Sequence, residues 1–175
     1  LDDSSDSLTI GLGSALGTTS HMVFDANGHI TKPLQPSFHV SKNANQTSLA
    51  INTAVTVIFQ NEVFDVGSNF TSNTFTAPVT GKYFLTASAI LGHPQTDATY
   101  IECYIQTSNR RYDLSLNDYD AFDSTTVYWT TNGAWVADMD ENDTAYVVFY
   151  QAAGTAASFI YSSTDGTTFS GHLLG

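Results

Sequence analysis

The chain has 175 residues, enough for one β-sandwich that buries roughly 70% of the surface exposed in its unfolded form. Its formal net charge of −12, with five lysines and arginines in all, would repel a phosphate backbone, so we expect no nucleic-acid partner. No apolar run approaches the ~18 residues that span a bilayer, so we also expect no membrane insertion. Abundant aromatic and β-branched residues favour strands over helices.

The first 35 residues differ in texture from the rest of the chain. Short apolar triplets at 8–10 and 22–24 are separated by Gly, Asn and Ser, and they are too small to enclose a core within one chain. Asn27-Gly28 predicts a hairpin with a two-residue turn. We therefore expect residues 1–35 to form a β-rich neck built with copies from neighbouring chains; the alternative is an unstructured linker.

Pro33 and Pro36 mark a domain boundary, because proline blocks both helix and ladder hydrogen bonds. From residue 36 to 175, short strand-like segments alternate with turn signals, among them Asn132-Gly133 and Asp165-Gly166. The predicted strands are 37–40, 55–59, 62–64, 72–77, 81–91, 98–108, 112–116, 125–131, 133–139, 144–151, 157–162 and 168–174. No helical period with caps interrupts them, so the pattern predicts an all-β antiparallel sandwich.

Several of these strands carry apolar or aromatic residues on both faces, as in 100–105 and 146–150. A sandwich covers one face of each sheet, so the second face needs another cover. Self-association is the simplest cover, and a sugar-binding aromatic surface is the alternative. Cys103, the only cysteine, shares a face with Ile101 and Ile105, which predicts a buried small residue rather than a reactive thiol.

A motif near the middle of the chain identifies a family resemblance. Phe64 precedes the segment in which Phe75, Gly81 and Tyr83 stand at the spacing Phe, five residues, Gly, one residue, Tyr. This spacing resembles the signature of the complement C1q family. Phe169-Ser170-Gly171, followed by apolar residues, is similar to the closing strand of the same family. The resemblance implies a C1q/TNF-like jelly-roll sandwich over residues 36–175, a homotrimer and a non-enzymatic binding role.

The entry to this domain, residues 30–38, resembles the entry to the C1q-like heads of bacteriophage tail or capsid fibre proteins. No Gly-X-Y repeat precedes the domain, as a collagen stalk would require. The resemblance implies the head of a viral fibre, located on the virion, that attaches to a host-cell surface protein or glycan. The alternatives are a secreted C1q-like binding protein of cellular origin and a polysaccharide-degrading tail protein.

No catalytic constellation stands out. The chain has no Gly-x-Ser-x-Gly elbow, phosphate-binding Gly-rich loop or His-Glu-x-x-His array, so we expect no enzyme activity and no organic cofactor. Asp138, Asp140 and Asp143 supply the hard oxygen ligands that calcium prefers, which makes them a candidate calcium site. A solvated acidic turn is the alternative.

A second acidic segment combines carboxylates with aromatic rings, which suggests an exposed recognition loop. Its candidate binding residues are Asn117, Asp118, Tyr119, Asp120 and Phe122.

Overall fold

The computed structural model describes residues 7–13 and 19–174. The chain divides into two compact units, Leu1–Pro36 and Ser37–Gly175. In the described part, none of the helical segments has the length and apolarity needed to cross a membrane.

The first unit is a small antiparallel sheet of three strands, β1 (Leu8–Gly11), β2 (Ser20–Phe24) and β3 (Ile30–Thr31). The hairpin predicted at Asn27-Gly28 joins β2 to β3, with Phe24 opposite Ile30. Its turn is wider than predicted: Gly28 alone takes a positive φ of 84°, while the Asp25 carboxylate accepts hydrogen bonds from the Asn27 and His29 amides. The sheet has no second layer of its own among the described residues of this unit.

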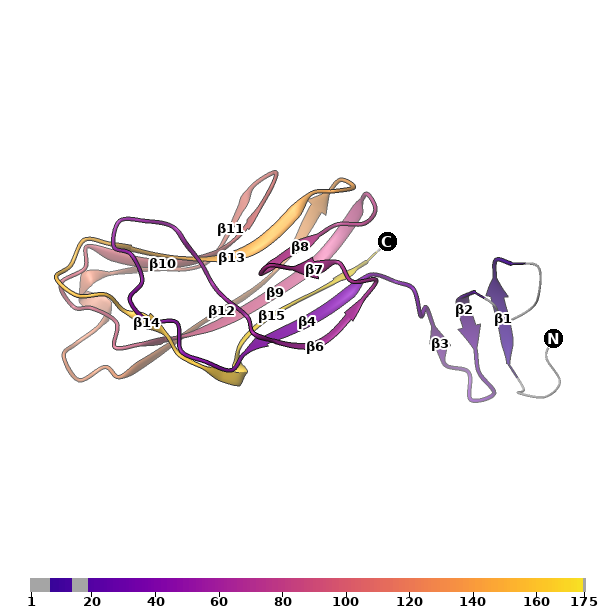
Figure 1. The fold of residues 1–175 in the computed structure, drawn as a ribbon, viewed down its shortest axis with the longest axis horizontal. Coiled ribbons are helices and arrows are strands. Elements are labelled where there is room, and N and C mark those ends of the chain that lie inside the picture. Colours follow the sequence, from indigo (N-terminus) through magenta and orange to yellow (C-terminus); the bar gives the residue numbers. More distant parts are fainter. Residues whose placement is uncertain (1–6, 14–18, 175) are drawn as a thin grey trace. The chain divides into compact units, whose positions relative to one another are not determined.

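The second unit is a sandwich of two antiparallel sheets, seen as two layers in Figure 1. One sheet has the order β11-β10-β13-β8-β7, with β5 paired to β13, and the other has the order β12-β9-β15-β4-β6, with β14 paired to β9. The strands are β4 (Ser37–Lys42), β5 (Val55–Thr56), β6 (Asn61–Val66), β7 (Phe70–Thr71), β8 (Thr74–Thr76), β9 (Gly81–Gly92), β10 (Tyr100–Thr107), β11 (Arg111–Asp118), β12 (Tyr128–Met139), β13 (Thr144–Ala152), β14 (Phe159–Ile160) and β15 (Ser163–Leu173). The predicted jelly-roll sandwich is confirmed.

Buried and half-buried side chains alternate along β9, and the buried ones form the core between the two sheets. In β9, Tyr83, Leu85, Ala87, Ala89 and Leu91 are all buried, whereas the residues between them are only half-buried. Such a period of two places one row of side chains in the core and the other on the outer face. Cys103 is fully buried, as predicted, and burial raises the pKa of its thiol to about 12.

Two sequence-based turn predictions were wrong, and both positions lie within strands. Asn132 and Gly133 pair with Ser88 and Ala87 inside the continuous strand β12. Gly133 is needed there for packing, because a Cβ atom would lie 2.9 Å from a methyl group of Leu114. Gly166 lies at an irregularity inside β15 rather than between strands.

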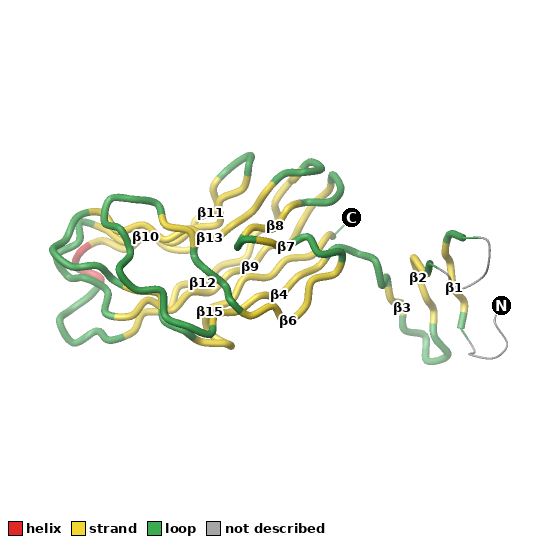
Figure 2. The backbone as a smooth tube through the Cα atoms, viewed as in Figure 1, coloured by secondary structure: helices red, strands yellow, loops and turns green. Residues whose placement is uncertain are grey.

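The predicted strand 55–59 is also shorter than expected, because only Val55 and Thr56 pair with β13. Much of the connection from β4 to β6 is loop, as Figure 2 shows. Lys42, the last residue of β4, is fully buried beside this loop. Its Nζ donates to the Ile58 carbonyl oxygen at 2.8 Å and to Gln46 Oε1 at 3.4 Å.

Lys42 is buried without a carboxylate partner among the described residues. Burial disfavours the charged ammonium and lowers the pKa of Lys42 to about 8. The folded chain therefore releases this proton near pH 8, whereas the unfolded chain keeps it up to its ordinary pKa of 10.5. In this interval the unfolded state binds more protons, so the Lys42 contribution to the free energy of unfolding increases as pH rises.

Replacing Lys42 with Met removes this titration. We expect the free energy of unfolding of the wild-type chain, relative to Lys42→Met, to rise by about 1 kcal/mol between pH 7 and pH 9. Urea titrations at each pH, at one protein concentration, measure the difference. Lys82→Met is the matched control, because Lys82 is exposed beside Asp138 and its variant should give a flat difference. Parallel pH curves for wild type and Lys42→Met would contradict the assignment.

Candidate binding surfaces

Three of the six signature residues predicted from the sequence lie in an aromatic cluster in the core. Phe75, Tyr83 and Phe169 are each fully buried. Phe38 of β4 contacts the rings of Phe75 and Phe169, with centroids 4.7 and 5.0 Å apart, and the rings of Phe75 and Tyr83 lie 5.5 Å apart. The Tyr83 hydroxyl donates to the Val79 carbonyl at 2.8 Å, which satisfies its polar end.

The remaining signature residues have different surroundings. A Cβ atom on Gly171 would lie 2.7 Å from side-chain carbons of both Leu85 and Phe38, so this position admits only glycine without a shift of the core. Gly81 begins β9 opposite Met139. Phe64 is 48% exposed and its ring lies 6.0 Å from that of His39, so it belongs to an outer surface rather than to the core.

The calcium site predicted at Asp138, Asp140 and Asp143 is not formed. Across residues 7–13 and 19–174, no three His, Cys, Asp or Glu side chains are grouped so that they could hold a metal ion. Asp138 lies 3.7 Å from Lys82 Nζ, while Asp143 Oδ2 accepts hydrogen bonds from the Asn109 side chain and the Asp140 amide. The carboxylates therefore diverge, and Asp143 closes the turn between β12 and β13.

The predicted recognition segment does not present all its residues to solvent. Asn117 lies opposite Ile101 on the inner side of β11, and its Nδ2 is buried without a hydrogen-bond partner in the described chain. Phe122 is 6% exposed and packs edge-on against Trp129, with centroids 5.2 Å apart. Phe122 is thus part of the hydrophobic core rather than an exposed recognition residue.

The other three residues of the segment are closer to the prediction. Asp118 ends β11 and is exposed, and Asp120 is exposed within the 3₁₀ turn η1 (Tyr119–Ala121). The side chain of Tyr119 lies outside the described residues. Asp118 alone of these residues lines a cavity, which also involves residues of β10 and β11.

The outer face of the β12-β9-β15-β4-β6 sheet is broad and uncharged at its centre. One row across four strands places Val136, Phe84, His172 and Ser37 side by side, and the next row includes Ala134, Thr86, Ser170, His39 and Phe64. Val136 is 52% exposed, and the Phe84 and His172 rings lie 5.5 Å apart. The charged pair Lys82 and Asp138 lies beyond these rows, toward the end of the strands.

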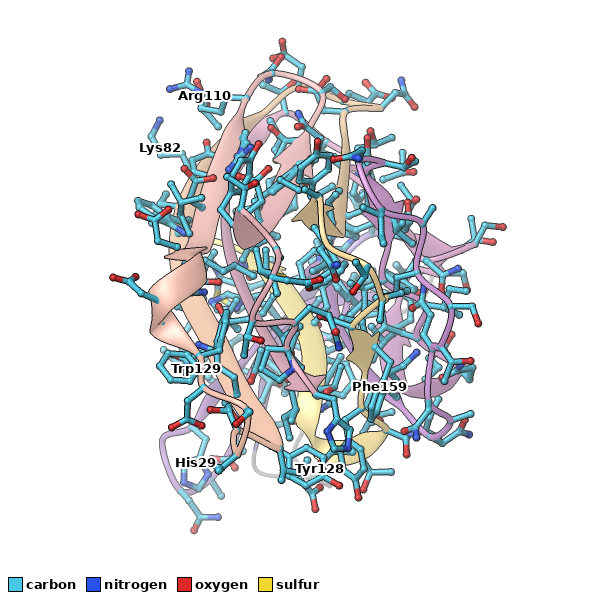
Figure 3. All side chains as sticks on the ribbon, turned by 90° about the vertical axis from the view of Figure 1, so that its left-hand side faces the viewer. His29, Lys82, Arg110, Tyr128, Trp129 and Phe159 are labelled. Carbon is cyan, nitrogen blue, oxygen red and sulfur yellow. The ribbon has the colours of Figure 1, made fainter. Side chains whose placement is uncertain are left out.

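The same outer face continues toward the opposite end of β9. Gly92 is paired with both Tyr128 of β12 and Phe159 of β14, and both side chains are labelled in the lower half of Figure 3. A Cβ atom on Gly92 would meet the Phe159 ring at 2.1 Å, so glycine is required for this approach. Tyr128 is 52% exposed and its ring lies 4.8 Å from that of Tyr161. Exposed aromatic surface thus extends along the sheet.

The outer face of the opposite sheet is hollowed by a cavity of about 390 Å³ over β10 and β11. Its lining residues are Tyr100, Glu102, Arg111, Leu116 and Asp118. Pairing places Glu102 opposite Leu116 and Tyr100 opposite Asp118, so alternation sends these four side chains to the same outer face.

Arg111 and Glu102 form the charged floor of this cavity. Two guanidinium nitrogens of Arg111 donate to the two carboxylate oxygens of Glu102, at 3.1 and 2.6 Å, and Nε donates to Asp113. The guanidinium also lies 4.0 Å from the centre of the Tyr104 ring. The bonds to Glu102 and Asp113 raise the pKa of Arg111, so its guanidinium stays protonated.

Sequence reasoning did not select Tyr100, Glu102 or Arg111 as a site. The alternation of Tyr100, Glu102 and Tyr104 on one face was visible in the sequence, but the arginine that completes the cavity comes from the next strand. A bulge between Cys103 and Tyr104 sets the register that brings Arg111 to Glu102. The sequence does not reveal that bulge.

Comparison with known proteins gives one family and a set of similar folds. The family model described as C1q domain matches residues 37–174. The globular domain of zebrafish complement 1qA superposes with a TM-score of 0.55 at 20% identity, covering 81% of this chain and 98% of that one. Murine APRIL at pH 8.0 gives a TM-score of 0.56 at 20% identity, covering 80% and 99%. Comparison with curated proteins finds no significant match.

The ion pair in the cavity predicts a specific stability loss. Replacing Arg111 with Met removes three charge-assisted hydrogen bonds and leaves Glu102, which is 8% exposed, without its counter-charge. We expect the free energy of unfolding to fall by about 1.5–3 kcal/mol, and Glu102→Gln to recover part of the loss in the double variant. Denaturant unfolding of the four chains measures this coupling.

Arg110→Met is the matched control for this cycle. Arg110 is the adjacent arginine, its side chain is exposed and it projects from the sandwich in Figure 3. We expect this substitution to change stability by less than about 0.5 kcal/mol. An equal loss in both arginine variants would mean that overall charge, rather than the pair with Glu102, sets the effect.

Proposed function

The chain belongs to the C1q domain family, and on this basis we propose that it is a non-enzymatic, homotrimeric binding head that acts outside the cell. The observation that carries the proposal is the uncharged outer face of the β12-β9-β15-β4-β6 sheet, with Val136, Phe84 and His172 at its centre. A broad face without charges at its centre, on which apolar side chains such as Val136 stay exposed, is typical of an interaction surface. Copies of the same chain, arranged around a threefold axis, cover this face on every subunit.

We further propose that the trimer is the head of a viral fibre that attaches to a host-cell surface protein or glycan. The first unit supports this role. Ile10 of β1 is 53% exposed, Leu12 just after β1 is 72% exposed and Ile30 of β3 is 58% exposed, so these apolar side chains lack a covering partner among residues 7–13 and 19–36. Equivalent sheets from neighbouring chains would supply that partner and form a neck before the head.

A secreted binding protein of cellular origin is the second candidate. The similar solved structures include proteins of zebrafish and mouse, and the C1q domain occurs typically in extracellular proteins. Both candidates share the trimeric head, and they differ in what the neck is attached to.

The trimer predicts a molecular mass in solution about three times the 18.9 kDa of one chain. Val136→Asp places a charge at the centre of the proposed interface, where burial without a partner is costly, so we expect this variant to dissociate at micromolar concentration. Sedimentation equilibrium measures the mass, and circular dichroism shows that the variant remains folded. Val79→Asp, at a 44% exposed position outside the sheet, should remain trimeric. A monomeric wild-type chain contradicts the proposal.

The fibre role predicts that the coding region of this chain is flanked by genes for structural virion proteins. It also predicts that an antibody against the head labels the tips of virion fibres in electron microscopy. Flanking genes of a cellular chromosome, together with a secretory signal at the start of the full coding region, would favour the second candidate. Release of reducing sugar from host envelope glycans by the purified chain would instead indicate a polysaccharide-degrading tail protein.

A further inference from the structure

We propose that the cavity over β10 and β11 is a binding site for a neutral saccharide. The proposal deepens the binding role proposed above and rests on it. At about 390 Å³, the cavity lies within the ~300–1,000 Å³ of typical small-molecule sites. Its described lining combines one aromatic ring, one aliphatic side chain and three charged groups, a mixture that matches the apolar faces and hydroxyl edges of a sugar ring.

Tyr100 and Leu116 supply the apolar wall of the site. The Tyr100 ring stacks on Tyr150, with centroids 5.8 Å apart and ring planes 26° apart, so its orientation is fixed from behind. Leu116 is 64% exposed on the neighbouring strand. The C–H groups on one face of a pyranose can pack against such a ring and an adjacent aliphatic side chain.

Glu102, Arg111 and Asp118 supply the polar contacts. Arg111 uses three of its five N–H donors on Glu102 and Asp113, which leaves two for a hydroxyl oxygen. Asp118 is exposed and forms no ion pair within the described ranges, so its carboxylate can accept from sugar hydroxyls. Hydroxyl groups both donate and accept, and the cavity offers N–H donors on Arg111 and a carboxylate acceptor on Asp118.

The charges around the cavity select against other ligands. Glu102, Asp113 and Asp118 outnumber the single cation Arg111, so sialic acids, phosphates and other anions are repelled. A quaternary ammonium is favoured by several aromatic faces around one point, whereas Tyr100 is the one aromatic residue in the described lining of this cavity and Arg111 brings a positive charge. A neutral saccharide carries neither the negative charge that the carboxylates repel nor the positive charge that Arg111 repels.

The site lies on the other sheet from the face that the proposed trimer covers. Trimer formation would use the outer face of the β12-β9-β15-β4-β6 sheet, and the cavity lies on the opposite sheet. Three equivalent cavities would then face outward from one head. Three weak sites that engage one glycan-coated surface bind it far more tightly than one site does.

The test is titration of the full chain with methyl glycosides of glucose, galactose, mannose and N-acetylglucosamine, followed by saturation-transfer NMR and calorimetry. We expect at least one of these neutral sugars to bind. Tyr100→Ala removes the stacking ring and Asp118→Asn removes the exposed charge, and each should weaken binding at least about tenfold. Tyr146→Ala on the same sheet face and Asp165→Asn on β15 are the matched controls and should stay within about twofold.

Binding of choline in place of every neutral sugar, binding of no sugar, or unchanged affinity in both folded cavity variants would overturn the site. Staining of intact host cells with fluorescently labelled heads tests the attachment role separately from sugar binding in the cavity. If no methyl glycoside binds and wild-type and Asp118→Asn heads stain cells equally, the binding function stands and the saccharide site is wrong. If a sugar binds the cavity but labelled heads stain no cell, the attachment role fails and the saccharide site stands.

Discussion

A β-strand presents alternate side chains to two faces, and a sandwich of two sheets buries only one of them. This constraint governs the head from residue 37 onward. In β9 the inner row from Tyr83 to Leu91 is fully buried, while Phe84 and Ile90 on the outer row are only half-buried. In β10 the inner row is Ile101, Cys103 and Ile105, and the outer row carries Tyr100 and Tyr104. Each sheet therefore has an outer face with aromatic residues, and these two faces differ mainly in charge.

The inner rows hold the sheets together through a small number of aromatic contacts between distant parts of the chain. Phe38 contacts the rings of Phe70, Phe75 and Phe169, and so ties the first strand of the head to the last. Gly171 allows this approach because no side chain intervenes between Phe38 and Leu85. These contacts fix the register of the paired strands. A shift of one strand by one residue would turn all its outer side chains inward. The positions of both outer surfaces thus follow from packing in the core.

The sequence predicted the architecture well because it depends on local signals that repeat along the chain. Alternation, proline boundaries and the spacing of Phe75, Gly81 and Tyr83 were sufficient for a jelly roll of the observed family. Local signals failed where tertiary contacts decide the conformation. Asn132-Gly133 has the composition of a turn, yet it continues β12 because β9 pairs with it and Leu114 occupies the space beside the glycine. Phe122 was expected in solvent, but its ring packs edge-on against Trp129 of β12. The pairing of Arg111 with Glu102 depends on a bulge that the sequence does not mark.

The distribution of positive charge limits what the head can bind. The chain has a formal net charge of −12, and several of its five cations are already engaged: Lys42 is buried, Arg111 is paired with Glu102 and Asp113, and Lys82 lies beside Asp138. At long range the surface therefore repels anionic partners, including acidic polysaccharides and anionic lipids, and salt weakens that repulsion beyond about 8–10 Å. Attachment through neutral contacts avoids this opposition, because hydrogen bonds and ring stacking act within a few ångströms. The neutral ligand proposed for the cavity is thus consistent with the acidic surface. The surface repels competing anions, and a neutral ligand brings no charge that the surface would have to neutralise.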